Sequence, residues 1–325
     1  MRNVIAIRLL LSIFFAIAIG FSAGHQILGV SRDYNNYLLF FDLVRSASDY
    51  FDIQYRFEPG FTAVVYWLVN AGLDNYLVYS IIAASIVFVK YIAIDADYIE
   101  AYAATIFIFT FYFLSRYVVL FEMTVLRGAC AFSLAFLVFL RKNSAGIRWR
   151  ELLLLLLAVA FHYSAFVLIF IYLIRPANRF VTVLVPLGVF VAIVLMKNVA
   201  LTYLPNVIPV FATYEEFGRA SLLPIPLVLD LAFFALALYH FDEADLVMRY
   251  AVLGMGLGFA FHFALIDYSI LAARFRELLS VFSLVYVVRV VSCGNERIVR
   301  YTVVYTLLAG MINFYVVFFY DPLLS

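Results

Sequence analysis

The sequence predicts an all-α integral membrane protein, a polytopic bundle of about 9–11 transmembrane helices that leaves little mass outside the bilayer. Of its 325 residues, 67% are hydrophobic and only 13% are charged, and the mean hydropathy is +1.04. Soluble domains carry about 25% charged residues. Because a chain of this length leaves many residues at its surface, these apolar residues need lipid as their solvent.

A helix needs about 20 apolar residues to cross the roughly 30 Å of hydrocarbon in a bilayer. The first such segment begins at Val4 and continues to about Val30. It has no clear small-residue cleavage site, so we interpret it as a retained helix and not as a signal peptide. In chain order, the expected spans are 4–24, 76–94, 101–120, 124–140, 180–197, 222–239, 247–266, 270–291 and 300–320.

Two further apolar segments are harder to assign. Residues 60–72 are short, beginning after Pro59 and closing at Gly72. Residues 151–174 are long enough to cross once, but the polar triplet His162-Tyr163-Ser164 interrupts them. Non-helical backbone at membrane depth is tolerated where it is buried in protein or lines a wet cavity, so both segments would mark a site.

Loop charge bears on how these segments cross, because cytoplasmic loops are enriched in Lys and Arg. Loop 31–58 holds five acidic against three basic residues, which suits the outer face. All the basic loops lie on the cytoplasmic side only if neither of these segments crosses the membrane completely. Residues 151–174 would then form two half-helices that meet near His162. Residues 60–72 would enter the bilayer partway or lie on its outer surface. The alternative is that one loop breaks the charge rule and 151–174 is an ordinary span. The basic segments are 1–8, 141–150, 175–179 and 289–300.

The sequence predicts one membrane domain over residues 1–325. Its largest non-spanning parts are the outer loop 31–58 and a second segment, 198–221. We find no internal repeat and no linker composition, so no domain boundary is expected.

Ionisable side chains inside a bilayer cost several kcal/mol, so each of them needs an explanation. Those beyond snorkelling reach of the basic loops are Arg127, His162, Asp230 and His262. His162 fits a catalytic role or a core histidine that bonds a helix carbonyl. Asp230 and His262, with Asp267 nearby, fit either a proton-relay set or polar contacts that hold helices together.

Three arginines, Arg127, Arg274 and Arg276, are expected at outer helix ends, against the usual distribution of positive charge. A guanidinium is permanently charged and binds phosphate in a bidentate fork, so three of them near one face would suit a diphosphate. The structural alternative is that each reaches lipid headgroups or pairs with a carboxylate such as Glu122 or Glu277.

Other classes of site are not indicated. The net charge of +1 gives no reason to expect a nucleic-acid partner. The two cysteines, Cys130 and Cys293, provide neither a disulfide framework nor metal-ligand spacing. No Gly-rich phosphate loop, Ser/His/Asp order or zinc-like cluster occurs, so we expect no nucleotide, metal or other cofactor.

Short patterns at the ends of the apolar segments give a family resemblance. In chain order they are Asp33-Tyr34-x-x-Tyr37, Phe57-Glu58-Pro59-Gly60-Phe61, Leu126-Arg127-Gly128-x-x-Ala131, Phe161-His162-x-Ser164-Ala165 and Arg274-Phe275-Arg276. Over about residues 30–290 the sequence resembles the EpsG-like branch of the bacterial Wzy-type polysaccharide polymerases. Two positions depart from that pattern: Gly128 stands where the family usually has Gln, and Thr124 where it has Asn. An amide contact to substrate is therefore missing or supplied elsewhere.

The resemblance implies a membrane glycosyltransferase whose active site faces the periplasm across the bacterial inner membrane. Such O-antigen and exopolysaccharide polymerases transfer a growing chain from undecaprenyl diphosphate to the sugar of an incoming lipid-linked unit, and they use no nucleotide sugar. The implied partners are the lipid-linked oligosaccharide and membrane lipid. A chain-length regulator protein is a further partner that the sequence leaves open.

The resemblance also implies roles for the arginines. Arg127 would stabilise the departing diphosphate, as preorganised cations do for other developing anions, and Arg274 and Arg276 would assist it. A further set of substrate-binding candidates comprises Asp33, Tyr37 and Ser164.

The acceptor hydroxyl in such a reaction benefits from a general base within hydrogen-bond reach. The candidates are Glu58 and His162, with Asp33 third. Glu58 is preferred because carboxylates usually do this work in oligosaccharide chemistry.

Three other functions stay open. A polysaccharide ligase would use the same diphosphate chemistry but usually carries a larger outer loop than 198–221. A transporter of lipid-linked sugars would be expected to show internal repeats and polar sites at mid-membrane. A membrane acyltransferase could use His162 only if the inside and outside assignments were exchanged.

Overall fold

A computed structural model describes residues 2–53, 57–94, 99–142, 146–207, 219–320 and 324 of the chain. The regular secondary structure in these ranges is helical, with one isolated bridge between Ser31 and Leu324. The predicted all-α fold class is therefore confirmed. The chain divides into two compact units. The first comprises Met1–Arg141, Gly146–Ile169 and Val290–Ser325, and the second comprises Lys142–Ala145 and Phe170–Arg289. The single membrane domain stays a prediction.

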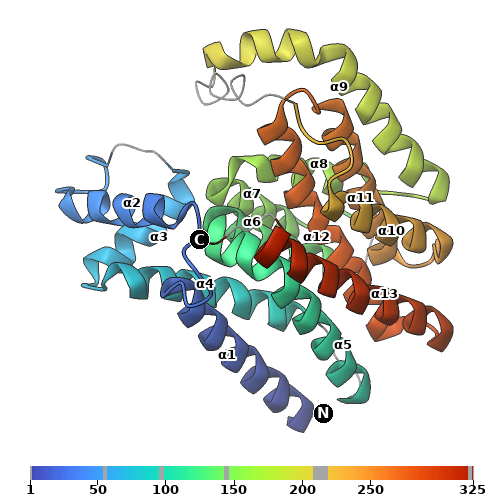
Figure 1. Ribbon diagram of the computed structural model, residues 1–325, viewed down its shortest axis with the longest axis horizontal. Helices are drawn as coiled ribbons and strands as arrows, with labels where there is room; N and C mark the ends of the chain where they lie inside the picture. Colours follow the sequence, from blue (N-terminus) through green and yellow to red (C-terminus); the bar gives the residue numbers. More distant parts are fainter. Residues whose placement is uncertain are drawn as a thin grey trace. The chain divides into compact units, whose positions relative to one another are not determined.

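Figure 1 shows the helices coloured in chain order. Those of the first unit are α1 (Arg2–Gly24), α2 (Tyr34–Ser46), α3 (Pro59–Asn70), α4 (Asn75–Ala93), α5 (Ile99–Tyr112), the π-helix η1 (Phe113–Thr124), α6 (Leu126–Leu140), α7 (Trp149–Phe161), the 3₁₀ turn η2 (Tyr163–Ala165), the start of α8 (Phe166–Ile174), and α13 (Glu296–Tyr315) with its π-helical end η4 (Val316–Tyr320). Those of the second unit are the rest of α8, α9 (Arg179–Val207), α10 (Ile225–Tyr239), α11 (Leu246–Ala264) and nearly all of α12 (Ser269–Cys293).

These helices lie where the sequence predicted spans, and they make the chain a multi-pass membrane protein. In the described part of the chain, six stretches are long and apolar enough to cross a bilayer: Ile5–Gly24, Asn75–Ala93, Ala101–Thr124, Arg179–Lys197, Leu246–Ala264 and Glu296–Tyr320. Shorter apolar helices cover Leu126–Leu140, Tyr163–Ile174 and Ile225–Tyr239. Helix α12 has 25 residues, but its first turns carry Arg274, Arg276 and Glu277.

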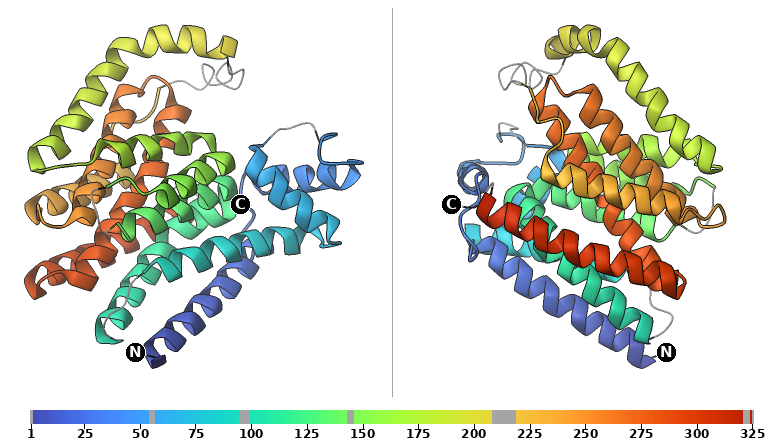
Figure 2. Two further views of the ribbon diagram at one scale, coloured as in Figure 1. Left: turned by 180° about the vertical axis from the view of Figure 1, so that it is seen from behind. Right: turned by 45° about the vertical axis from the view of Figure 1, so that its right-hand side comes forward.

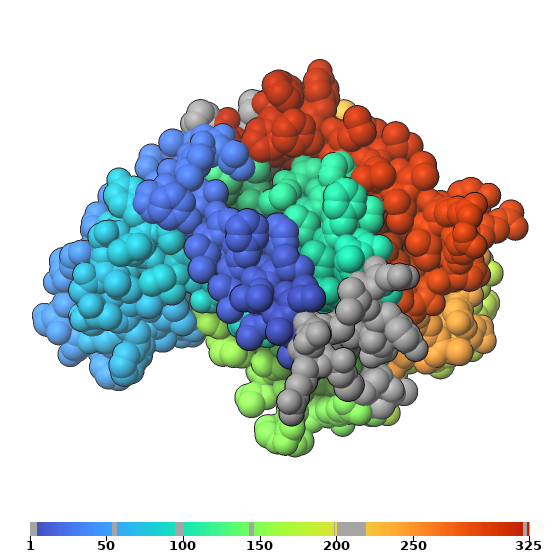
Figure 3. Space-filling view, turned by 90° about the horizontal axis from the view of Figure 1, so that it is seen from below, coloured from blue at the N-terminus to red at the C-terminus, as the bar shows by residue number. Residues whose placement is uncertain are grey.

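Small residues bring α1 and α4 together along their lengths (Figures 1 and 2). A Cβ atom at Gly20 would lie 2.7 Å from the Ser80 carbonyl oxygen, and one at Gly24 would lie 2.7 Å from the Tyr76 carbonyl oxygen. Such close backbone approach is typical of helix packing in membranes. One side of α1 is uncovered in Figure 3. Leu10, Phe14 and Ile17 are among the exposed apolar residues of this helix.

Helices α2 and α3 are too short to cross a bilayer. At 1.5 Å per residue, the 12 residues of α3 extend about 18 Å, and α2 has 13 residues. They pack against each other beside one end of α4 (Figure 2). Loop 31–58 is thus partly helical, because Tyr37, Phe40, Phe41 and Val44 recur at helical spacing and form the buried side of α2.

The chain breaks its helix at His162, as predicted. α7 ends at Phe161, His162 adopts an extended conformation with φ −157° and ψ 113°, and one 3₁₀ turn leads into α8. In the second unit, Lys142 donates a hydrogen bond of 3.0 Å to the Tyr172 hydroxyl near the end of α8. This contact supports a hairpin of α7 and α8. A chain that reverses direction at His162 brings the end of α8 back to the residues just before α7.

Helix α9 continues to Val207, whereas its apolar stretch long enough to cross a bilayer is Arg179–Lys197. The first ten residues of the segment 198–221 are thus helical, and residues 208–218 lie outside the described residues. That this segment does not span the membrane stays a prediction. Three alternating glycines of α11, Gly254, Gly256 and Gly258, allow close packing. A Cβ atom at Gly254 would lie 2.1 Å from the Phe282 ring of α12.

Candidate functional site

Glu58 occupies the N-cap position of α3, but its side chain does not cap that helix. The backbone at Glu58 is extended, and Pro59 fixes the first helical turn, which suits proline because that position needs no N–H donor. The carboxyl group is buried, with 4% of the residue exposed. It accepts hydrogen bonds from two other segments of the first unit, one at Arg127 and one at His162.

Arg127 lies in the first turn of α6 and forms an ion pair with Glu58 through Nη1 and Oε2. Its guanidinium carbon lies 4.1 Å from the centre of the Phe57 ring, within cation–π range. Its Nε is buried and has no hydrogen-bond partner among the described residues. The sequence alternative that the outer arginines pair with carboxylates is borne out for two of them: Arg127 pairs with Glu58, and Arg276 pairs with Glu277 at 3.4 Å.

His162 completes the cluster from the break between α7 and α8. Its Nδ1 lies 3.1 Å from Glu58 Oε1, and the Tyr163 backbone N–H donates to the same oxygen at 3.4 Å. A carboxylate accepts and does not donate, so Nδ1 carries the proton in this contact. His162 is therefore not a core histidine bonded to a helix carbonyl.

Two glycines allow the three segments to meet. A Cβ atom at Gly60 would lie 2.8 Å from the Ala160 carbonyl oxygen, so a larger residue there would push α3 away from α7 and Glu58 away from His162. A Cβ atom at Gly128 would lie 3.0 Å from a Val125 methyl and 3.8 Å from the His162 ring. The departure from the usual Gln at position 128 thus leaves room beside the histidine.

The hydrogen-bonding and charged partners of Glu58 determine the pKa of its carboxyl group. Burial alone raises the pKa of the Glu58 carboxyl, but the His162 hydrogen bond and the Arg127 charge outweigh burial and lower that pKa to about 2. Glu58 is therefore ionised throughout the physiological range, and a carboxylate of such low basicity is a weak proton acceptor.

This shift predicts an acid-dependent loss of stability. The folded pKa of about 2 lies below the ordinary value of 4.5, so the contribution of Glu58 is complete above pH 4.5 and is lost as the pH falls toward 2. Between pH 5 and 2, the unfolding free energy of the detergent-solubilised protein should lose roughly 3 kcal/mol through this group. Denaturant titrations of wild type and Glu58→Gln should converge over this window, and a constant difference between them would contradict the assignment.

The first unit also contains three other predicted site residues, Tyr37, Asp33 and Ser164. The Arg127 backbone N–H donates to the Tyr37 hydroxyl at 3.5 Å, and Tyr37 is buried. Burial raises the pKa of Tyr37, so the phenol stays protonated. Asp33 caps α2 without a side-chain hydrogen bond, and its charge acts on Tyr37. Ser164 is half-buried in the turn after His162.

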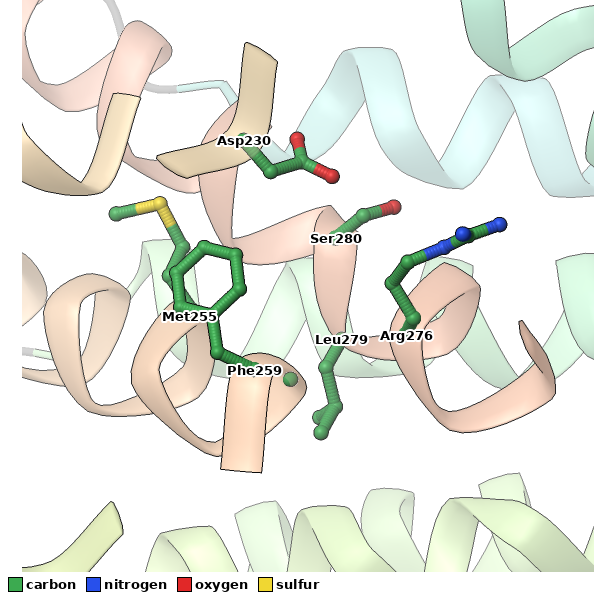
Figure 4. Close-up of a pocket in the computed structure, with 7 residues that line it drawn as sticks. Asp230, Met255, Phe259, Arg276, Leu279 and Ser280 are labelled. Atoms are coloured by element: carbon green, nitrogen blue, oxygen red, sulfur yellow. The ribbon is translucent and has the colours of Figure 1, made fainter. Parts of the chain in front are cut away.

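Arg274 and Arg276 lie on α12 in the second unit. Arg274 is exposed, whereas Arg276 lines a pocket with Asp230, Ser280 and an apolar wall. Figure 4 shows the Asp230 carboxyl and the Ser280 hydroxyl on the same side of this pocket as the Arg276 guanidinium. His262 is buried, whereas Asp267 is exposed and pairs with Lys197 at 2.6 Å. Across the ranges that the structure covers, no group of three or more His, Cys, Asp or Glu side chains is arranged to hold a metal ion.

Comparison with known families decides the assignment. A family model described as the EpsG family matches residues 8–324. The chain belongs to the EpsG family. No curated protein matches it, and no solved structure matches it.

Membership in the EpsG family supports a polysaccharide polymerase-type role at a membrane. The match extends beyond residues 30–290, over which the sequence motifs gave the resemblance. Three of those motifs supply Glu58, Arg127 and His162, and the structure joins them in one cluster within the first unit.

This EpsG-family chain also contains a buried ion pair that the sequence analysis missed. Lys90 of α4 pairs with Glu122 of η1, and both side chains are fully buried. The Lys90 ammonium lies 4.8 Å from the Phe113 ring centre and 4.3 Å from that of Phe132. The available signal was a lysine within the predicted span 76–94 and a glutamate between the predicted spans 101–120 and 124–140.

Proposed function

We propose that this EpsG-family protein polymerises oligosaccharide repeat units carried on undecaprenyl diphosphate. It transfers a glycan from one lipid carrier to the sugar of another, at the periplasmic face of the bacterial inner membrane. The observation that carries the proposal is the cluster of Glu58, Arg127 and His162, which combines a phosphate-binding cation with a histidine held in a defined tautomer.

Arg127 binds the diphosphate of the donor. A guanidinium matches phosphate oxygens in a bidentate fork, and its unpartnered Nε offers a donor for this purpose. Arg127 also lies at the N-terminus of a 15-residue helix, where N–H groups and the helix dipole favour an anion. As the bond between the anomeric carbon and the diphosphate oxygen breaks, the charge on the leaving group grows, and Arg127 stabilises it.

His162 accepts the proton of the acceptor hydroxyl. With Nδ1–H donated to Glu58, Nε2 takes that proton while the hydroxyl oxygen forms the new bond to the anomeric carbon. Glu58 orients the ring and stabilises the imidazolium that forms, the part that a buried carboxylate plays beside a histidine base. This assignment differs from the sequence-based preference for Glu58 as the base, because Glu58 already accepts from three donors and is weakly basic.

The periplasmic location rests on loop charge. Glu58 is the last residue of the acidic loop 31–58, whereas the basic loop 141–150 lies at the other end of α6 from Arg127. Cytoplasmic loops are the basic ones, so the Glu58 cluster faces outward.

A deletion strain of the native host tests the proposal. It should accumulate single lipid-linked repeat units and lose long chains, and the wild-type gene should restore them. If even single surface-displayed repeats disappear, the protein acts as a transporter or ligase and the polymerase proposal fails.

A further inference from the structure

The phenol of Tyr37, on α2, is a buried polar group to which the proposed chemistry assigns no role. Only 2% of the residue is exposed, so almost no surface of the phenol is open to a substrate. Its hydroxyl accepts a hydrogen bond of 3.5 Å from the backbone N–H of Arg127. Both residues belong to the first unit, so this contact lies within one compact part of the chain.

The first turn of α6 needs acceptors from outside the helix. The first four N–H groups of a helix have no partner within it, and Val125, at the N-cap of α6, provides no side-chain cap. The Tyr37 hydroxyl accepts from the Arg127 N–H in place of such a cap. It therefore ties the backbone of Arg127 to α2 and fixes the point from which the guanidinium extends.

The guanidinium of Arg127 is held by neighbours of the same phenol. It pairs with Glu58, and its central carbon lies 4.1 Å from the centre of the Phe57 ring. That ring packs against the Tyr37 ring, with 5.5 Å between the two centres. Tyr37 thus contacts the backbone of Arg127 directly and supports its side chain through Phe57.

The phenol is suited to this contact because it is neutral. A neutral phenol can accept a hydrogen bond and adds no charge beside the guanidinium, whereas a phenolate would compete with a diphosphate for it. Burial raises the pKa of Tyr37, and the nearby charge of Arg127 opposes this rise only in part. The phenol is therefore protonated throughout the physiological range.

We propose that Tyr37 is a positioning residue that holds Arg127 in place for the donor diphosphate. The inference rests on the proposed function, in which Arg127 binds that diphosphate. A guanidinium that is fixed before the substrate arrives loses less conformational freedom on binding. It is also already directed at the leaving group when the negative charge grows there. This role replaces the substrate contact that the family resemblance implied for Tyr37.

Tyr37→Phe tests the proposal, because it removes the hydroxyl and keeps the ring. The probe is farnesyl diphosphate, a soluble analogue of the lipid carrier, added to purified protein in detergent. Its binding should weaken about threefold to tenfold, the usual effect of losing one hydrogen bond. In the Arg127→Ala background, Tyr37→Phe should weaken binding no further, because the guanidinium that it positions is absent. A purely structural role would weaken binding in both backgrounds.

Tyr34→Phe is the matched control. Tyr34 is a buried tyrosine three residues earlier on α2, and its hydroxyl donates to the Gly24 carbonyl oxygen of α1. This variant should bind farnesyl diphosphate as wild type does. The proposal is refuted if Tyr37→Phe leaves the affinity unchanged, if it weakens binding equally with and without the Arg127 guanidinium, or if wild type does not bind the probe.

The deletion strain tests the polymerase function separately. If that strain loses even single surface-displayed repeats while Tyr37→Phe still weakens diphosphate binding through Arg127, the polymerase function fails and the positioning role stands. If the strain accumulates single repeats while Tyr37→Phe changes nothing, the function stands and the positioning role fails.

Discussion

Replacing Arg127 with alanine is expected to lower polymer-forming turnover by about 100- to 1,000-fold, the usual effect of removing one preorganised group that stabilises developing charge. The leaving diphosphate would lose the guanidinium that binds it. Arg127→Lys keeps a positive charge but not the planar fork, so its loss should be smaller. Turnover and farnesyl diphosphate affinity of purified protein provide the measurement. His162→Ala should lose turnover and keep that affinity, because it removes only the proton acceptor.

The controls for Arg127→Ala must distinguish a loss of catalysis from a loss of folding. Arg127→Ala leaves Glu58 buried without its cation, which destabilises a protein by itself. The double variant Arg127→Ala/Glu58→Gln removes both charges and should be folded but inactive. Arg45 is the matched control, since it is an exposed arginine of α2 that bonds the Leu73 carbonyl oxygen at 3.0 Å; Arg45→Ala should polymerise normally. Near-normal chains from folded Arg127→Ala protein would rule out the assigned role.

Lys90→Met is expected to reduce the unfolding free energy by about 3–5 kcal/mol, the range for breaking a buried ion pair from one side. Glu122 would remain fully buried, and its Oε2 already has no hydrogen-bond partner among the described residues. Denaturant unfolding in detergent micelles would measure the loss.

The double variant Lys90→Met/Glu122→Leu is the critical comparison for this pair. Replacing both charges with apolar groups of similar volume is often neutral or stabilising, and the Phe113 and Phe132 rings already provide apolar surroundings. The double variant should therefore recover most of the stability. If it is as unstable as Lys90→Met, the cost comes from packing and not from an unpaired charge.

Hydrophobic length alone was enough to predict the membrane helices and most of their boundaries. The break at His162 was also predictable, because a polar triplet interrupts an apolar segment between two basic loops. The helix inside loop 31–58 was missed although its buried residues recur at helical spacing. The interpretation of that loop rested on its charge. Charge indicates on which side of the membrane a segment lies, but it does not indicate the secondary structure of that segment.

The contacts of the candidate site could not be derived from spacing. Glu58 is 69 residues from Arg127 and 104 from His162, and their meeting depends on the close approach of Gly60 to Ala160. Lys90 was overlooked because it lies four residues from the end of a predicted span, where a lysine ordinarily reaches the interface. Only the three-dimensional structure shows that its side chain points inward to Glu122.

The ion pair between Glu58 and Arg127 has a consequence for which molecules can reach that arginine. A bilayer surrounds the protein with phospholipids, each of which offers one phosphate. A guanidinium without a neighbouring negative charge would bind these abundant headgroups, and it would then be occupied when the substrate arrives. Because Glu58 already balances Arg127, a competing ligand must offer more negative charge than a single carboxylate. The diphosphate of the proposed donor does so, and we expect phospholipids with a single phosphate to bind Arg127 weakly.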